Sequence, residues 1–232
     1  CGKMKKEVAV IGLGYVGLPS VINHAENGHQ VTGFDIDQRK VDLLNQGTSH
    51  INTVADETVQ GLLEQGVIFT ADEQLVLHKD VYIIDVPTPI DDKKTPNLSY
   101  IQAAVSMLEG KVKKGALIVL EEYLVNRFTS LGYEIGTDLF IAYSPERIDP
   151  GNTQSLGAKI PRIVAGYTER CLAQAKAFFG EHVTPVSDLK TAELAKIYEN
   201  TFRLVNIALA DELQKISDNL AIDAGEVIEA AA

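Results

Sequence analysis

Three glycines near the start of the chain have the spacing of a dinucleotide-binding turn. Gly12, Gly14 and Gly17 follow an apolar segment at residues 8–11 and precede sequence that favours a helix, which is the order of strand, turn and helix that such a site requires. The first glycine permits a tight turn, the second lets the backbone approach a pyrophosphate, and the third lets the helix pack closely on the strand. The N–H groups of the helix's first turn then face the anion. The turn therefore predicts a site for a dinucleotide such as NAD.

An acidic residue follows at the distance expected for a ribose contact. Residues 30–34 are predicted to form a second strand, and Asp35 comes eighteen residues after Gly17, about where the ribose-binding carboxylate belongs. A carboxylate at this position would repel a 2′-phosphate, so it favours NAD over NADP. The alternative is a glycine turn without a ligand, and the second strand with its terminal acid argues against it.

Three further strand ends carry polar or constrained residues that could contact a ligand, because ligands of open α/β sheets bind beyond the carboxyl ends of the strands. They are Pro87-Thr88-Pro89, Glu121, and residues 144–147, which include Glu146. Each has a simpler explanation. The prolines could be present simply to end a strand, and Glu146 could form an ion pair with Arg147 or with another basic residue on the surface.

A polar stripe lies on the longest periodic segment, residues 189–220. Glu193, Lys196 and Asn200 are three and four residues apart, so they share one face of a helix, and Arg203 continues that face. We expect so long a helix to be a spine between domains or subunits and largely enclosed, which would require partners for its polar side chains. A buried lysine and an asparagine amide can both donate to an oxyanion that develops during a reaction. The alternative is a solvated helix face.

The elements that would position these residues alternate between strands and helices. Strands are predicted at residues 8–11, 30–34, 67–69, 80–86, 116–121, 139–143, 162–165 and 183–186. Helices are predicted at residues 38–45, 56–65, 98–108, 168–179 and 189–220, the last with Ser187 or Asp188 as its N-cap. The alternation predicts an α/β fold, a Rossmann-type doubly wound parallel sheet covered on both faces and followed by a long central helix. We expect an NAD-binding domain at residues 1–186. Residues 187–232 would hold the long helix and the start of a dimerisation and substrate domain.

Composition excludes several classes of function. The 232 residues carry a formal net charge of −11, so no nucleic-acid or anionic-membrane surface is expected, because such surfaces are built from Lys and Arg clusters. No apolar run approaches the ~20 residues of a membrane span, and we expect a cytoplasmic protein. Cys171 lies in a predicted helix outside every motif and is expected to be a structural or idle thiol. The five histidines show no metal-ligand spacing, so we expect no metal and assign them no role.

Four motifs, taken together, resemble the nucleotide-sugar 6-dehydrogenases, the family of UDP-glucose dehydrogenase and the UDP-N-acetylhexosamine dehydrogenases. The motifs occupy residues 12–19, 86–89, 144–151 and 193–201, in this order across nearly the whole chain. The Pro-Thr-Pro and Ser-Pro-Glu-Arg-Ile-Asp-Pro-Gly forms look closer to the UDP-N-acetylmannosamine and UDP-N-acetylglucosamine branch than to the UDP-glucose branch.

The resemblance implies NAD-dependent oxidation of the C6 alcohol of a UDP-sugar to a carboxylate, in two steps that consume two NAD. In this family a cysteine from further along the chain holds the aldehyde as a thiohemiacetal and then as a thioester that water cleaves. Six residues match cofactor contacts of the family: Asp35 and Lys40 at the adenosine ribose, Tyr15 and Val16 at the pyrophosphate, and Pro87 and Thr88 at the far half of the cofactor. Glu146 matches the glutamate of the hydrolytic half-reaction, and Lys196 and Asn200 match residues that stabilise charge on the C6 oxygen.

The chain departs from the family at two places. After Leu120 and Glu121 the family continues with Ser-Thr-Val and a Pro-Gly turn near the nicotinamide, whereas helix-like sequence resumes here at Glu122-Tyr123-Leu124-Val125. We expect a loop to be missing there, with Glu121 as the cofactor contact at that strand end. The sequence also stops inside a segment that resembles the start of the family's substrate domain. The catalytic cysteine and its neighbouring aspartate are therefore expected outside it, and this chain by itself is expected not to complete the oxidation.

Other functions stay open at this point. They are UDP-glucose 6-dehydrogenase, another NAD-dependent dehydrogenase that joins a Rossmann domain to a long helix, such as the 6-phosphogluconate or 3-hydroxyacyl types, and a non-catalytic NAD-binding scaffold. The long helix also predicts a homodimer, because it offers more apolar face than one domain is expected to cover. The expected partners are thus a UDP-sugar and a second copy of the chain.

Overall fold

A computed structural model describes residues 5–90, 92–120, 123–145 and 161–231. The strands are β1 Glu7–Ile11, β2 Gln30–Phe34, β3 Ile68–Thr70, β4 Val81–Ile84, β5 Ala116–Val119, β6 Leu139–Tyr143, β7 Arg162–Gly166 and β8 Val183–Pro185. The helices are α1 Gly17–Glu26, α2 Gln38–Asn45, α3 Asp56–Glu64, η1 Glu73–Val76 (a 3₁₀ helix), α4 Ser99–Leu108, α5 Tyr123–Ser130, α6 Glu169–Phe179, α7 Leu189–Leu220 and α8 Ala224–Ala231. Each strand and helix predicted from the sequence is present, and η1 and α8 are additional.

The strands form one sheet in the order β3-β2-β1-β4-β5-β6-β7-β8. The chain leaves β1 toward β2 and β3 and then returns to the other side of β1 at β4, so the sheet is doubly wound with its switch point between β1 and β4. The predicted parallel sheet is confirmed for β1 to β6, and β7 is the exception: it runs antiparallel to β6 and pairs Ala142 with Gly166 and Tyr143 with Ala165. A parallel connection needs a crossover, usually a helix, and the sequence predicts none between these two strands.

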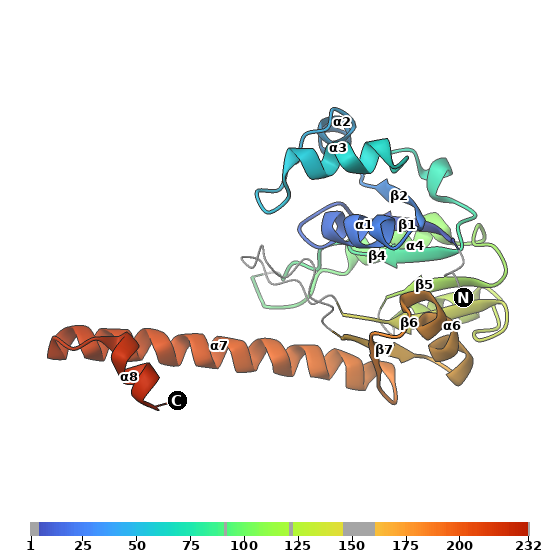
Figure 1. Cartoon of the computed structure of the whole chain (residues 1–232). Helices are drawn as coiled ribbons and strands as arrows, with labels where there is room; N and C mark the ends of the chain where they lie inside the picture. The colour runs from blue at the N-terminus through green and yellow to red at the C-terminus, as the bar shows by residue number, and fades with distance from the viewer. Residues whose placement is uncertain (1–4, 91, 121–122, 146–160, 232) are drawn as a thin grey trace. The chain divides into compact units, whose positions relative to one another are not determined.

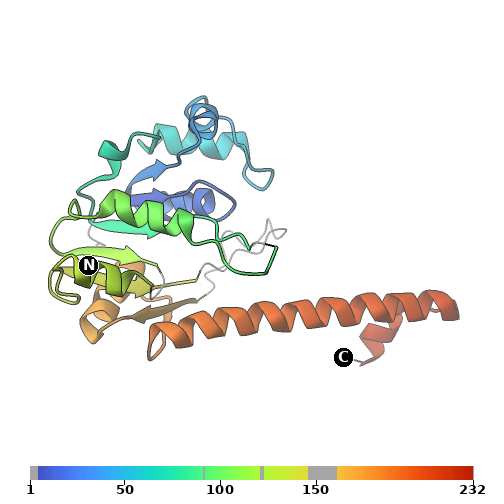
Figure 2. The same ribbon diagram turned by 180° about the vertical axis from the view of Figure 1, so that it is seen from behind.

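Both faces of the sheet are buried. Alternate residues of one strand point to opposite faces, and in β1 both Val8 and Val10 on one face and Ala9 on the other are fully buried. Helices α1 and α6 lie on the face toward the viewer in Figure 1, and α4 lies on the opposite face in the reverse view of Figure 2. Val21 of α1 joins the core on the first face, and Ile101 of α4 is also buried.

Side chains cap the starts of several helices, among them α2, α6 and α7. Asp37 accepts the Arg39 N–H at 3.1 Å before α2, and Thr168 accepts the Cys171 N–H at 3.1 Å before α6. Asp188, the second of the two residues predicted as a cap for α7, accepts the Thr191 N–H at 2.8 Å. Such a bond satisfies one of the N–H groups that a helix leaves unpaired in its first turn.

The chain divides into two compact units, residues 1–192 and residues 193–232. The first unit contains the sheet. The second contains most of α7 and all of α8, with Ala221 at a φ of 54° in the turn between them. No helix in the described part of the chain is both long and apolar enough to cross a bilayer.

Candidate functional site

The glycine turn joins β1 to α1 at the carboxyl edge of the sheet. Gly12 has a φ of +96°, and its N–H donates to the Phe34 carbonyl of β2 at 2.8 Å. A Cβ on Gly17 would lie 1.7 Å from the Gly12 carbonyl oxygen, so only glycine allows α1 to begin so close to the turn. A Cβ on Gly14, in contrast, would meet no atom within 4 Å. The turn is therefore tightly packed on its inner side and open beside Gly14, which is the shape that a pyrophosphate needs.

The open side also carries free donors. In the described part of the chain, the N–H groups of Gly14, Tyr15 and Val16 have no acceptor. Tyr15 and Val16 are exposed, and both line the same cavity as Gly14. Unpaired N–H groups at the start of a helix are an anion-binding arrangement. These three residues could therefore hold the phosphates of a dinucleotide.

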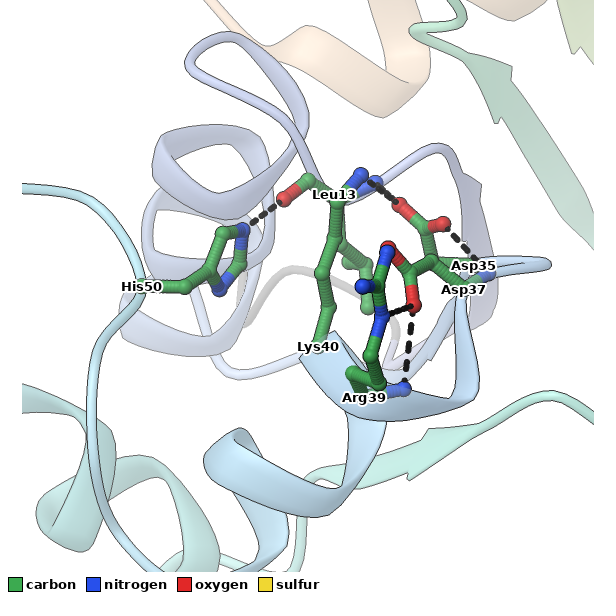
Figure 3. A network of polar contacts seen from close by, with 6 residues as sticks. All are labelled: Leu13, Asp35, Asp37, Arg39, Lys40 and His50. Carbon is green, nitrogen blue, oxygen red and sulfur yellow. Dashed lines mark hydrogen bonds and ion pairs between the residues drawn. The ribbon is translucent and has the colours of Figure 1, made fainter.

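Asp35 lies immediately after β2 and is buried, with only 6% of the residue exposed. Figure 3 shows its carboxylate among three donors: Oδ2 accepts the Leu13 N–H at 3.0 Å and pairs with Lys40 Nζ at 3.0 Å, and Oδ1 accepts the Asp37 N–H at 2.9 Å. A buried carboxylate requires such partners. Because a carboxylate has about four acceptor positions, one stays available to a ribose hydroxyl in the cavity that Asp35 and Lys40 line.

A second ion pair lies beside the first. Arg39 donates from Nε and Nη2 to the two carboxylate oxygens of Asp37 at 3.1 and 3.0 Å (Figure 3). The hydrogen bond from the Arg39 guanidinium holds the pKa of the Asp37 carboxyl below its ordinary value. The Arg39 side chain is 90% exposed, so this pair orders the start of α2 without adding much stability.

The cavity has a volume of about 460 Å³ and spans the switch point of the sheet. It brings together eight of the predicted cofactor residues: Gly12, Gly14, Tyr15, Val16, Asp35, Lys40, Pro87 and Thr88. Gly17 does not line it and acts through the packing of α1. The ends of β4, β5 and β6 complete the wall, with Val119, Leu120, Ser144 and Pro145 among its residues. Glu121 and Glu146, predicted at two of these strand ends, lie outside the described residues.

Two charged residues of the cavity were missed in the sequence. Asp85 follows β4 at the same edge as Asp35, and Arg162 begins β7. A signal for Asp85 was present, since it is the last polar residue of a predicted strand and such strand ends face the ligand. Arg162 carried no signal, because its approach to the cavity depends on the antiparallel course of β7.

Lys196 and Asn200 belong to the second unit. Lys196 and Glu193 are half-buried, and Asn200 is exposed. Arg203 pairs with Glu199 at 3.6 Å along the helix. The expectation of a largely enclosed helix is not met within one chain, because every residue from 201 to 212 is exposed.

Cys171 lies apart from the cavity, and the described residues form no cluster of metal ligands. Cys171 is fully buried, and its Sγ accepts from the Ile141 N–H at 3.4 Å and the Thr168 hydroxyl at 3.2 Å. It does not line the cavity. The described residues contain no group of three or more His, Cys, Asp or Glu side chains that could hold a metal ion.

Comparison with known proteins gives two family matches. Residues 6–183 match the NAD binding domain of the UDP-glucose/GDP-mannose dehydrogenase family, and residues 190–232 match the central domain of the same family. The cavity lies within the first match. The site thus fits NAD on three grounds. The glycine turn of Gly12, Gly14 and Gly17 leaves room for a pyrophosphate, the Asp35 carboxylate is held in place at the turn, and the matching family domain binds NAD.

Several individual proteins are similar over most of the chain. The UDP-N-acetyl-D-mannosamine dehydrogenase of Salmonella typhimurium is 37% identical, and the NDP-N-acetyl-D-galactosaminuronic acid dehydrogenase of Ralstonia nicotianae is 35% identical, each over 97% of this chain. The solved UDP-N-acetyl-mannosamine dehydrogenase Cap5O of Staphylococcus aureus has a TM-score of 0.78 and 34% identity over 97% of this chain and 58% of its own. The chain spans 58% of the length of each of these relatives. The Salmonella alignment extends over 245 residues, so that relative has residues in the matched region without a counterpart among these 232.

Proposed function

Because the chain belongs to the UDP-glucose/GDP-mannose dehydrogenase family, we propose that its protein oxidises the C6 hydroxyl of a UDP-N-acetylhexosamine to the carboxylate with NAD. The observation that carries the proposal is the cavity at the switch point, where the glycine turn, Asp35 with Lys40, and Pro87 with Thr88 meet. Residues 1–186 would bind the cofactor. Residues 187–232 would begin the part that binds the sugar and forms the dimer.

Each group in the cavity has a separate task in this proposal. The N–H groups of Gly14, Tyr15 and Val16 bind the pyrophosphate, since nothing else in the described chain accepts from them. The free acceptor position of Asp35 binds the adenosine ribose. Pro87 and Thr88 then contact the other half of the dinucleotide. NAD, when bound, accepts the hydride from C6.

Residues on α7 and at two strand ends would act on the sugar. Lys196 and Asn200 would donate to the C6 oxygen as it gains negative charge, because an amine and an amide aimed at a developing oxyanion stabilise it. Glu146 would assist the hydrolytic half-reaction, and Glu121 would contact the cofactor. Lys196→Ala in the complete protein should lower kcat at least a hundredfold, the order found when one oxyanion donor is removed. A non-catalytic NAD-binding scaffold would have no turnover to lose.

The test is NADH formation by the complete protein with UDP-N-acetylmannosamine, UDP-N-acetylglucosamine, UDP-N-acetylgalactosamine and UDP-glucose. An alcohol becomes a carboxylate by loss of four electrons, so two NADH should form for each sugar consumed. Preference for an N-acetylated sugar is expected, because the similar relatives are named for such substrates. Preference for UDP-glucose would favour the second candidate, which the same cavity could serve. Activity with none of the four would refute the proposal.

A homodimer formed through α7 is part of the same proposal. Its support is a row of apolar side chains, each more than half exposed, that recur every three or four residues or at twice that spacing: Tyr198, Phe202, Val205, Leu209, Ile216 and Leu220. Phe202→Asp combined with Leu209→Asp should halve the mass measured by light scattering, whereas Asp211→Asn, on the opposite side of the helix, should not. A monomeric mass for the unmodified protein would contradict the proposal.

A further inference from the structure

His50, which belongs to none of the sequence motifs, contacts the glycine turn. It lies in the loop between α2 and α3, and its Nε2 donates to the Leu13 carbonyl at 2.7 Å (Figure 3). The direction of this bond is fixed, because a carbonyl can only accept and so Nε2 must carry the hydrogen. His50 is half-buried, and its Nδ1 is buried with no partner in the described part of the chain.

The loop that carries His50 is itself anchored. The Ser49 N–H donates to Asp56 Oδ1 at 2.7 Å, and the Ser49 hydroxyl bonds the backbone of Ile51, which is only 2% exposed. Backbone and core contacts on both sides of His50 therefore set the position of the imidazole. A ring fixed in this way can in turn fix what it binds.

The bond matters for the cofactor because of what lies across the same peptide unit. The Leu13 carbonyl and the Gly14 N–H belong to one planar trans peptide and point in opposite directions. Holding the carbonyl on the His50 side therefore directs the Gly14 N–H to the other side, where Gly14 lines the cavity. If this peptide turned over, the carbonyl oxygen, with its partial negative charge, would face the phosphates.

Leu13 is thus held at both ends. Asp35 accepts its N–H at 3.0 Å, and His50 donates to its carbonyl at 2.7 Å. The two partners come from the residue that follows β2 and from the α2–α3 loop, so they fix two successive peptide planes independently. The second of these planes presents a donor to the cavity.

We propose that His50 is a positioning residue of the cofactor site, which orients the Leu13–Gly14 peptide so that an N–H, not a carbonyl, faces the pyrophosphate of the dinucleotide. The inference rests on the proposed function only in taking a dinucleotide as the ligand. It assigns His50 no contact with the cofactor or the sugar. Its effect should therefore appear in affinity for ligands that contain the pyrophosphate.

The test compares His50→Gln with His50→Asn in the complete protein. Both are neutral amides, but the Asn side chain is one methylene shorter, so only Gln should bring an N–H within reach of the Leu13 carbonyl. Titration calorimetry with NAD and ADP-ribose should give binding weakened roughly tenfold to a hundredfold for Asn, the equivalent of one hydrogen bond to a charged group, and within about threefold of the unmodified protein for Gln. Adenosine, which lacks the pyrophosphate, should bind both variants as it binds the parent. His182→Leu, at an exposed histidine, is the control for general effects of substitution.

The possible results separate the two proposals. His50→Asn with unchanged affinity for ADP-ribose would overturn the role of His50 and leave the proposed function intact. Equal losses for adenosine and ADP-ribose would also overturn it, since the residue would then act only through the fold. If His50→Asn fails to fold, a His50→Gln variant that is folded but binds ADP-ribose a hundredfold more weakly would overturn the role as well. A parent protein that binds adenosine but neither NAD nor ADP-ribose would refute the proposed function itself.

Discussion

Gly14 and Gly17 allow folding and binding to be separated by the same substitution at two nearby positions. A Cβ at Gly17 would lie 1.7 Å from the Gly12 carbonyl oxygen and 2.8 Å from its carbon. Both are backbone atoms, so α1 must move away from the turn, and overpacking of this kind costs about 1–3 kcal/mol or more. A Cβ at Gly14 meets nothing within 4 Å. Gly14→Ala should even stabilise the fold by about 0.4–1 kcal/mol, because alanine restricts the unfolded chain.

Affinity for NAD should show the reverse ranking: Gly14→Ala, which leaves the fold stable, should weaken NAD binding more than Gly17→Ala. The new methyl group of Gly14→Ala would occupy the side from which the pyrophosphate approaches, and loss of one hydrogen bond to a charged group costs about 1.5–3 kcal/mol. At about 1.4 kcal/mol for each factor of ten, NAD should bind about ten to a hundred and fifty times more weakly. The assays are thermal unfolding without ligand and titration calorimetry with NAD. A Gly14→Ala protein that is stable and binds NAD normally would refute the placement of the pyrophosphate, and a Gly17→Ala protein as stable as the parent would refute the close approach of α1.

Three further predictions concern Asp80, Asp188 and Asp35. Burial raises the pKa of Asp80, but hydrogen bonds from Lys113 at 2.7 Å and from a backbone N–H outweigh it, so the pKa is lowered. Its contribution is then present above the unfolded pKa of about 3.9 and is lost as the pH falls through the folded value. Asp80→Asn should cost about 1–2 kcal/mol at neutral pH and flatten the acid limb of stability measured by urea unfolding. Asp188→Ala should remove the cap on the Thr191 N–H and lower the temperature of thermal unfolding, and Asp188→Asn should largely restore it; equal losses would contradict a capping role. Asp35→Asn should weaken NAD binding at least tenfold, since a charged acceptor for the ribose is lost; unchanged affinity would exclude the ribose contact.

The order of secondary structure was predictable because each element carries its own local signal. The apolar runs of β1 and β4, the acid at the end of β2 and the uninterrupted period of α7 all lie within short windows of sequence. The direction of β7 was not predictable in this way, because it depends on how the chain returns to the sheet. The exposure of α7 was mispredicted for a related reason, since burial of a helix depends on its neighbours and not on its own period.

The candidate site, too, contains residues that local sequence predicted and residues that only the fold brings in. Glycine spacing and the position of Asp35 identified the pyrophosphate and ribose part of the cofactor cavity from the sequence alone, because these residues meet backbone requirements that few others satisfy. Only the folded structure shows that Asp85 and Arg162 also line the cavity.

By itself, the sequence determined the family, the kind of cofactor and the parallel winding of the first six strands, since all three follow from short motifs and from alternation along the chain. Only the tertiary structure decided what surrounds the glycine turn. His50 is 37 residues from Leu13 and belongs to no motif, so its hydrogen bond to the turn exists only once the α2–α3 loop has folded over it. Contacts between distant segments form without a local signature, and the residues that orient a binding turn are of this kind.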